Sequence, residues 1–166
     1  MVEAYLNGIF PRSKALIAAT RGLDRGRVSA KEALETLLDD VRDLIALQRE
    51  AGFAYLSDGL LNWQDLFRPF VEAWEGLELG GLTRWFDNNT FYRQPMITGQ
   101  LQPSPMAAGF AQAGLLPDGE AWQAVLPGPY TFLTLAENHH YPSPREALHA
   151  LGEGLKTAAS ALREEG

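Results

Sequence analysis

The sequence predicts an α/β protein in which short strands alternate with helices around a parallel sheet. Two long segments space their apolar residues three and four apart, and each begins with a Ser-x-x-Glu capping box, the pattern of a helix N-terminus. Short apolar runs bounded by glycine and proline lie between the helical segments, as strands do. Because alternating strands and helices form parallel sheets, we expect about four strand–helix units in a single domain over residues 1–166.

The first half of the chain is predicted to hold two strands and one long helix. A strand is expected over residues 4–10, a helical turn over 15–21 and a second strand over 53–57. The long helix is expected from Ala30 to Ala51, because Ser29 and Glu32 form a capping box and Gly52 is a natural C-cap. Its buried face is expected to comprise Leu34, Leu37, Leu38, Val41, Leu44, Ile45 and Gln48.

The second half of the chain repeats the pattern less regularly. We predict a helix over residues 66–74, strand and loop over 83–99, a short helix over 105–113 and a strand over 121–126. A final helix begins at the capping box of Ser143 and Glu146, has Pro144 at its first position, and runs to about Glu164, with Gly166 as its C-cap. Its buried face is expected to comprise Leu148, Leu151, Leu155, Ala158, Ala159 and Leu162.

The composition excludes several classes of protein. The 166 residues carry a net charge of −7 and a pI of about 4.9, which argues against general nucleic-acid binding because that needs a basic surface. The chain has no cysteine, so disulfides, thiolate nucleophiles and sulfur-dependent metal sites are excluded. There is no apolar run of about 20 residues and no secretory pattern at the N-terminus, and we therefore expect a soluble cytoplasmic protein.

The densest group of chemically distinctive side chains lies in residues 83–95. The group combines aromatic rings, guanidinium groups, a carboxylate and side-chain amides: Trp85, Phe86, Phe91, Tyr92, Arg84, Arg93, Asp87, Asn88 and Asn89. Aromatic rings favour burial or a flat ligand, and guanidinium groups favour planar carboxylates. We predict a binding site for an aromatic molecule that bears a carboxylate; the alternative is a strand and turn with its polar edge in water.

Polar residues also follow the first two predicted strands, at the strand ends where α/β proteins bind ligands. Arg12 and Lys14 follow the first strand, either as ligand contacts or in a solvated turn. Asp58 follows the second strand as a candidate general base or hydrogen-bonding group, with a helix N-cap as the alternative. Asp65 is interpreted as a helix cap or a supporting residue.

The segment 127–142 offers two further candidates. Gly128 and Thr131 follow the strand predicted over 121–126, in a tight turn whose free N–H groups face the strand end. His139 and His140 are adjacent, but neighbouring side chains rarely share a metal ion, and the sequence places no third ligand near them. We therefore predict no metal ligand in this chain, and whether either histidine has a role stays open.

Several motifs occur together in the order found in one enzyme family. They are Gly8-Ile9-Phe10-Pro11-Arg12, Gln48-Arg49-Glu50-Ala51-Gly52, Asp58-Gly59 with Trp63 and Asp65, Arg84-Trp85-Phe86-Asp87-Asn88-Asn89-Thr90, Tyr92, and Leu126-Pro127-Gly128-Pro129-Tyr130-Thr131-Phe132-Leu133. Over almost the whole chain, this ordered set resembles cobalamin-independent methionine synthase. The resemblance implies a (β/α)8 TIM barrel and methyl transfer from 5-methyltetrahydrofolate polyglutamate to homocysteine.

Within that family, the chain resembles the first, metal-free barrel of the two-barrel members more than the catalytic barrel. Trp63 and Asp65 fit the pattern of the first barrel, whereas the catalytic barrel has a glutamate where this chain has Leu60. The resemblance implies that Lys14 and Arg84 contact the glutamate tail of the folate. The complete substrate-binding set that we predict is Arg12, Lys14, Asp58, Trp63, Arg84, Trp85, Asp87, Asn88, Tyr92, Gly128 and Thr131.

The family's zinc ligands lie on later strands than those of this chain. We therefore expect no cofactor in this chain and zinc from the missing half of the barrel. Four strand–helix units are half of a TIM barrel, and half a barrel leaves two strand edges bare. We expect a truncated barrel, a homodimer of halves, or a partner that supplies the other half.

Two other functions stay open at this point. The same fold could hold a small carboxylate without any chemistry, as a non-catalytic binding or regulatory module. A different barrel enzyme, such as a hydrolase, could use Asp58 and Asp87 as an acid–base pair.

Overall fold

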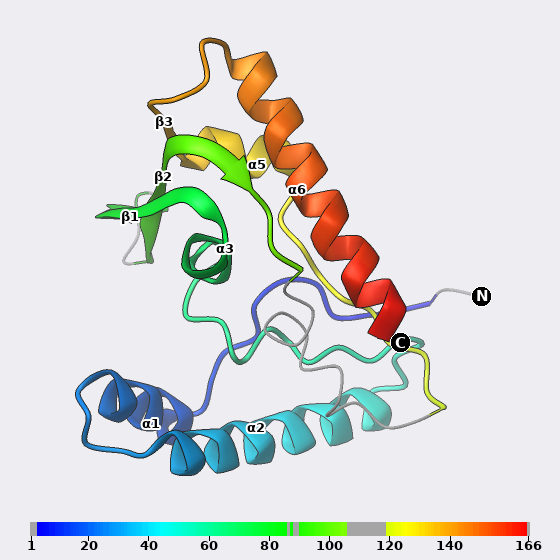
Figure 1. Cartoon of the computed structure of the whole chain (residues 1–166). Helices are drawn as coiled ribbons and strands as arrows, with labels where there is room; N and C mark the ends of the chain where they lie inside the picture. The colour runs from blue at the N-terminus through cyan, green and yellow to red at the C-terminus, as the bar shows by residue number, and fades with distance from the viewer. Residues whose placement is uncertain (1–2, 86, 88–89, 106–118, 166) are drawn as a thin grey trace. The chain divides into compact units, whose positions relative to one another are not determined.

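The computed structural model describes residues 3–85, 87, 90–105 and 119–165. Two compact units make up the chain: unit 1 comprises Met1–Asn62 and Ala111–Val125, and unit 2 comprises Trp63–Phe110 and Leu126–Gly166. Figure 1 labels the helices and strands in the chain order α1, α2, α3, β1, β2, α5, β3, α6. The first two helices belong to unit 1, and all the other labelled elements belong to unit 2.

Unit 1 begins with a short helix, α1 (Lys14–Asp24), where the sequence predicts one helical turn. The Ser13 hydroxyl caps the helix by accepting the Leu16 N–H at 3.0 Å. The Ser13 N–H in turn donates to Asp40 Oδ2 at 2.9 Å, which ties the start of α1 to the second helix.

Helix α2 (Ala30–Glu50) ends one residue before the predicted C-terminus. Its predicted capping box is confirmed, since Ser29 and Glu32 exchange both hydrogen bonds, and Gly52 has the left-handed φ of 72° expected beyond a helix end. The prediction for Leu34 is wrong: this side chain is 48% exposed, Ala33 is buried instead, and Leu38 is only partly buried. The core of unit 1 comprises Leu16, Leu37, Val41, Leu44, Ile45, Leu56 and Leu61, with Leu6 and Phe10 packed against it.

Three extended segments of unit 1 run parallel to one another. Isolated parallel bridges join Tyr5 to Tyr55 and Leu56 to Trp122. The Leu56 N–H donates to Ala121 O at 2.9 Å, and Leu56 O accepts the Gln123 N–H at 2.7 Å. The segments predicted as strands over 4–10, 53–57 and 121–126 are therefore adjacent and parallel, although each pairs through single bridges rather than a continuous ladder.

Unit 2 contains a three-stranded sheet in the order β1 (Glu75–Arg84), β2 (Phe91–Gln102), β3 (Glu137–Asn138). Strands β1 and β2 form an antiparallel hairpin with register shifts between Glu75 and Leu77 and between Leu79 and Leu82, and β2 pairs with β3 in parallel. Gly80 permits this close pairing, because a Cβ there would lie 2.7 Å from Gln94 O.

The helices of unit 2 are α3 (Arg68–Ala73), α5 (Pro129–Leu135) and α6 (Pro144–Glu165). The capping box predicted for α6 is confirmed: Ser143 Oγ accepts the Glu146 N–H at 3.3 Å and donates to Glu146 Oε1 at 2.9 Å. Its buried face comprises Ala147, Leu151, Gly154, Leu155, Ala158 and Leu162. Ala159 is exposed and Leu148 only partly buried, so the sequence placed two residues of this face wrongly.

Aromatic side chains form the core of unit 2. Phe67, Phe70 and Phe132 are fully buried. The centre of the Phe132 ring lies 4.9 Å from that of Phe67 and 5.4 Å from that of Phe70. The Trp74 ring stacks on Phe132 at 6.3 Å and packs on Gly154 of α6, where a Cβ would lie 2.5 Å from the indole. Because Gly154 has no side chain, α6 can pack closely against this core.

The mixed α/β class is confirmed, but the count of four strand–helix units is not. The segment predicted as the third unit, through residues 83–99, forms the antiparallel β1–β2 hairpin, because each strand finds its partner in the chain beside it. The short helix predicted over 105–113 falls almost wholly, and Gly166 entirely, outside the described residues. Across the described parts of the chain, no helix combines the length and the apolar character needed to cross a membrane.

Candidate functional site

The most distinctive backbone of unit 1 is the turn Asp58-Gly59-Leu60. Gly59 and Leu60 both have left-handed φ angles, of 63° and 52°, and an aliphatic residue rarely adopts such a conformation. A Cβ on Gly59 would lie 2.5 Å from Leu44 Cδ2, so only glycine fits there. Gly59 O accepts the Phe10 N–H at 2.8 Å, which joins this turn to the end of the first extended segment.

The side-chain amide of Gln48 holds the chain just before this turn, although the sequence predicts this residue only as part of the buried face of the long helix. Gln48 Nε2 donates to Ser57 O at 2.8 Å, and Gln48 Oε1 accepts the Ser57 N–H at 3.0 Å. Ser57 Oγ accepts the Gly59 N–H at 3.1 Å. Gln48 and Ser57 are 2% and 1% exposed, so the position of the turn is fixed from beneath. The one available signal was a glutamine on an otherwise apolar helix face.

Asp58 is a buried carboxyl group at the start of this turn. Its side chain is 3% exposed, and Oδ1 accepts the Leu60 N–H at 2.9 Å. Within the described part of the chain, Oδ2 is buried and has no hydrogen-bond partner. Burial raises the pKa of Asp58 to about 7, because removal from water penalises the ionised form more than the backbone hydrogen bonds favour it. A carboxyl group in this state can hold or release a proton near neutral pH.

Arg12 and Lys14 follow Phe10, at the same joined end of the two segments as Asp58. Lys14 is exposed at the start of α1, and Arg12 is half-buried. Arg12 Nη1 is buried without a hydrogen-bond partner among the described residues. Burial lowers the pKa of Arg12, and the positive charge of Arg21 adds to that effect.

In unit 2, the tip of the hairpin presents an exposed cationic and aromatic face. Arg84 and Phe91 are cross-strand partners, and the guanidinium carbon lies 5.5 Å from the ring centre, in cation–π geometry. Arg84 also lies 3.6 Å from the fully exposed carboxylate of Asp87. Leu82 and Arg93, the cross-strand pair two positions further along the hairpin, are exposed as well. Asn88, another predicted site residue, lies outside the described residues.

Trp85 links this face to the aromatic core. Its ring stacks on Phe67 at 5.9 Å and tilts against Tyr92 at 4.8 Å, and its side chain is partly exposed. Tyr92 is 3% exposed and donates its hydroxyl to Leu135 O at 3.0 Å. Burial raises the pKa of Tyr92, with a further contribution from the charge of Glu137. Of the three rings of Trp85, Phe67 and Tyr92, Trp85 is therefore the one that a ligand can reach directly.

Trp63 and Asp65 occupy supporting positions. Trp63 is 1% exposed and packs edge-on against Phe70 at 5.8 Å. Asp65 Oδ1 accepts the N–H groups of Phe67 and Arg68 at 2.9 and 2.8 Å. The N-cap of α3 is Phe67, so Asp65 supports the start of this helix from two residues before the cap.

The segment after residue 126 places its candidates at the surface. Gly128 begins α5 and accepts the Phe132 N–H at 2.9 Å, and Thr131 is exposed. His139 is exposed and lies 3.0 Å from Glu137 Oε2. Across the described residues, no group of three His, Cys, Asp or Glu side chains is placed to hold a metal ion.

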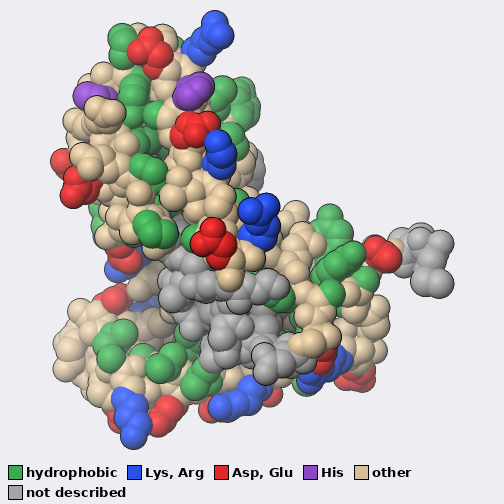
Figure 2. Space-filling view, turned by 45° about the vertical axis from the view of Figure 1, so that its right-hand side comes forward, with side chains coloured by type: hydrophobic (Ala, Val, Ile, Leu, Met, Phe, Trp, Pro, Cys, Tyr) green, Lys and Arg blue, Asp and Glu red, His purple; other side chains and the backbone are tan. Residues whose placement is uncertain are grey.

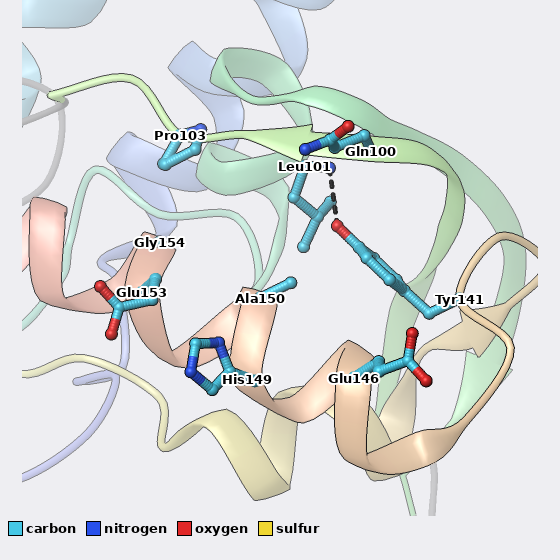
Figure 3. Close-up of a pocket in the computed structure, with 9 residues that line it drawn as sticks. All are labelled: Gln100, Leu101, Pro103, Tyr141, Glu146, His149, Ala150, Glu153 and Gly154. Carbon is cyan, nitrogen blue, oxygen red and sulfur yellow. Dashed lines mark hydrogen bonds between the residues drawn. The ribbon is translucent and has the colours of Figure 1, made fainter.

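A cavity of about 360 Å³ in unit 2 was not expected from the sequence (Figure 3). Its walls come from the end of β2, the segment before α6 and α6 itself: Gln100, Leu101, Pro103, Tyr141, Glu146, His149, Ala150, Glu153 and Gly154. Tyr141 Oη accepts the Leu101 N–H at 3.0 Å across the cavity. Glu146, His149 and Glu153 of α6 are three and four positions apart and therefore lie on the same side of the helix. This helical spacing is the one signal in the sequence that could have indicated that they lie close together.

The predicted site residues thus fall into two groups. Unit 1 brings Arg12, Lys14 and Asp58 to the joined ends of two parallel segments, and unit 2 brings Arg84, Trp85 and Asp87 to the hairpin tip, with Tyr92 beneath Trp85. A single rim that joins both groups stays a prediction. On the face in Figure 2, acidic and basic side chains of the described residues are interspersed rather than gathered into one basic surface.

Sequence comparisons point to one group of enzymes, although no protein-family model matches the chain. A methionine synthase of Sulfolobus acidocaldarius is 27% identical over 144 residues, which are 84% of this chain and 41% of that protein. A 5-methyltetrahydropteroyltriglutamate–homocysteine methyltransferase of Streptomyces griseus is 26% identical over 95% of this chain and 20% of its own length. A methionine synthase of Sulfurisphaera tokodaii is 26% identical over 96% of this chain and 47% of that protein.

Solved structures show the same likeness in fold. A B12-independent methionine synthase from a Shewanella species matches 84% of this chain and 42% of its own, with a TM-score of 0.65 and 22% identity. A protein from Listeria monocytogenes described as a putative vitamin-B12 independent methionine synthase matches the whole chain and 50% of its own, with a TM-score of 0.72 and 18% identity.

The chain is thus an α/β protein with polar groups at the joined ends of parallel segments and on an exposed hairpin. The resemblance predicted from its motifs is confirmed: it is similar to the cobalamin-independent methionine synthases in sequence and fold. It spans less than half the length of the curated relatives described above.

Proposed function

We propose that this chain supplies substrate-binding loops for methyl transfer from a 5-methyltetrahydrofolate polyglutamate to homocysteine. The observation that carries the proposal is the agreement of two comparisons, since relatives named for this reaction match in sequence and B12-independent methionine synthases match in fold over 84% or more of the chain. The proposal carries the activity named for the full-length relatives over to this chain, which covers less than half of the length of each of them.

The proposal treats the three parallel segments of unit 1 as neighbouring strands of a (β/α)8 barrel. The bridges Tyr5–Tyr55 and Leu56–Trp122 support this, because both are parallel and they share the middle segment. In such barrels, ligands bind at the carboxyl ends of the strands. Arg12 and Asp58 occupy those ends, and the Phe10–Gly59 hydrogen bond holds the two ends together.

Each proposed contact follows from the chemistry of the side chain. The guanidinium of Arg84 and the ammonium of Lys14 are exposed and suit the carboxylates of a glutamate tail. The partly exposed ring of Trp85 suits stacking on an aromatic ring of the ligand, and Tyr92 and Trp63 would act through the core beneath it. Asp58 would form a hydrogen bond with the ligand through Oδ2, which has no hydrogen-bond partner among the described residues.

The described residues do not fit a zinc site. They contain no group of three potential ligands, and the chain has no cysteine. We derive no chemical step through zinc, and we propose that any metal of the reaction is held by residues outside this sequence, in a partner chain that carries the rest of the barrel. A homodimer could complete the barrel without adding such residues. A light-scattering mass of the purified chain tests the homodimer, and a monomer at all concentrations would exclude it.

Calorimetric titration with 5-methyltetrahydropteroyltriglutamate tests the function directly. The chain should bind the ligand, and Arg84→Gln should weaken binding about tenfold, because one charge-assisted hydrogen bond is lost. Arg163→Gln is the matched control, since this exposed arginine lies near the end of α6 and should leave binding unchanged. No heat at millimolar ligand would refute the proposal, and binding without methyl transfer to homocysteine would limit the chain to holding the ligand.

A further inference from the structure

The cavity between the end of β2 and α6 has no part in the proposed methyl transfer. Its volume of about 360 Å³ is in the range of sites for small molecules. All of its wall residues lie in unit 2, and none of them belongs to the predicted substrate-binding set. The chemistry of its walls therefore points to a ligand of its own.

Two carboxylates stand at the two ends of this cavity. Glu146 and Glu153 are seven positions apart on α6, which places them on the same side of the helix and about 10.5 Å apart along its axis, at about 1.5 Å per residue. Figure 3 shows them at opposite ends of the cavity, with His149 and Ala150 between them. At this separation, each carboxylate can bind a cationic group of its own.

Both carboxylates keep an oxygen for a ligand. Glu146 Oε1 accepts the Ser143 hydroxyl at 2.9 Å, which fixes the side chain, and Oε2 has no hydrogen-bond partner among the described residues. Glu153 Oε2 lies 3.4 Å from Lys156 Nζ, but the two side chains are 60% and 73% exposed. Because an ion pair between exposed groups is weak, Lys156 does not prevent a ligand cation from binding to Glu153.

The wall between the carboxylates is apolar. Leu101 and Gly154 are buried, and Ala150 is partly buried. The Tyr141 ring lies toward the Glu146 end, where its hydroxyl oxygen accepts the Leu101 N–H at 3.0 Å and so fixes the ring (Figure 3). Since the face of an aromatic ring attracts cations, this end of the cavity favours a positively charged group.

Two separated anions with an apolar wall between them match a short aliphatic chain that carries an ammonium group at each end. Each ammonium can form charge-assisted hydrogen bonds with one carboxylate, while the methylene groups cover the apolar wall. A compact divalent cation cannot contact both carboxylates at this spacing, and across the described residues no group of three potential ligands surrounds a metal site. A folate glutamate tail is itself anionic and would be repelled.

We propose that this cavity binds a linear aliphatic diamine of the length of 1,4-diaminobutane. One ammonium pairs with Glu146 beside the Tyr141 ring, the other pairs with Glu153, and the methylene chain lies along Leu101 and Ala150. The extended diamine, with a hydrogen bond of about 2.8 Å at each end, spans a distance of the order of the carboxylate separation. The inference goes beyond the proposed methyl transfer, because it stands on unit 2 alone and holds whether or not the chain binds folate.

Calorimetric titration of the whole chain at low ionic strength tests the ligand. 1,4-Diaminobutane should bind, n-butylamine, which has one ammonium, should bind at least about tenfold more weakly, and 1,4-butanediol should give no heat. Equal binding of n-butylamine would overturn the two-ended assignment, and no heat with 1,4-diaminobutane at millimolar concentration would overturn the site. Magnesium chloride at the same concentration should not displace the diamine, and full displacement would refer the binding to charge alone and refute the site.

Two variants with matched controls locate the binding. Glu146→Gln and Glu153→Gln should each weaken binding of 1,4-diaminobutane at least about tenfold, and glutamine at position 146 preserves the capping box. The controls are Glu32→Gln, the capping-box glutamate of α2, and Glu35→Gln, an exposed glutamate that pairs with Lys31. Both controls should leave binding unchanged, and an equal loss in a control and its matched variant would refute the site.

Thermal unfolding gives a second readout of the same site. 1,4-Diaminobutane should raise the unfolding temperature of the parent chain and of Glu32→Gln, because the ligand binds the folded state. It should leave the unfolding temperature of the double variant Glu146→Gln, Glu153→Gln unchanged. A rise of the same size in the double variant would show that the diamine acts elsewhere on the chain. The folate titration is independent of these results, because it depends on other residues.

Discussion

Replacement of Asp58 by asparagine should make the stability of this chain less dependent on pH. Asparagine keeps the shape of the side chain and an oxygen that can accept the Leu60 N–H, and it removes the ionisable group. At neutral pH the parent chain must either keep a buried carboxyl protonated or leave a carboxylate oxygen without a partner among the described residues. The variant has no ionisable group, but its Nδ2 takes the buried position of Oδ2 without a partner among the described residues, and this cost is the same at every pH.

The size of the effect follows from the pKa of Asp58 in the two states. The pKa rises from 3.8 to about 7 on folding, which corresponds to about 4 kcal/mol at about 1.4 kcal/mol per tenfold change. Since the folded state binds this proton more tightly, its contribution to stability is fully present below pH 3.8. It declines as the pH rises and is lost above about pH 7. Four kcal/mol is a large fraction of the roughly 5–15 kcal/mol that stabilises a typical domain.

Urea unfolding of both proteins between pH 4 and pH 8.5 measures this difference. The difference in the free energy of unfolding should change in favour of Asp58→Asn as the pH rises from 4 and should level off above about pH 7, with about 4 kcal/mol as the upper bound of this change. Asp87→Asn is the control, because Asp87 is fully exposed, and it should track the parent chain at every pH. A difference between the two proteins that does not change between pH 4 and pH 8.5 would refute the reasoning, because the pKa of Asp58 would then be the same in the folded and unfolded states.

Two further predictions concern packing and a buried hydrogen bond. Gly154→Ala should lower the free energy of unfolding by about 1–3 kcal/mol, because the new Cβ would lie 2.5 Å from Trp74. Gly152→Ala is the control: its Cβ would meet no atom within 4 Å, so the substitution should leave the free energy of unfolding unchanged or raise it by up to about 1 kcal/mol. Urea unfolding of both variants measures the difference, and equal effects would contradict the prediction. Gln48→Leu should lower the free energy of unfolding by about 2–3 kcal/mol in the same assay, because the buried N–H and C=O of Ser57 lose their hydrogen-bond partner. An unchanged free energy of unfolding would show that these two groups form other hydrogen bonds.

The candidate site was predictable in composition but not in arrangement. The residue types at 83–95 indicated an aromatic and cationic group, and the structure exposes Arg84 at the hairpin tip. The sequence could not distinguish Trp63, which is 1% exposed, from Trp85, which is partly exposed, because both are tryptophans near a helix or strand end. Exposure depends on which chain segments pack over a ring, and that is a property of the folded unit.

The sequence by itself determined the two long helices, α2 and α6, but it predicted a tight turn where the structure has α5. Their hydrogen bonds join residues four apart, so the capping boxes at Ser29 and Ser143 and the apolar spacing behind them were sufficient to place α2 and α6. Only the tertiary structure decided the pairing of the extended segments, because strand partners are distant in sequence, and it turned one predicted strand region into the β1–β2 hairpin. The same holds for the pKa of Asp58 and for the cavity between the end of β2 and α6, since burial and enclosed space arise only when remote segments pack together.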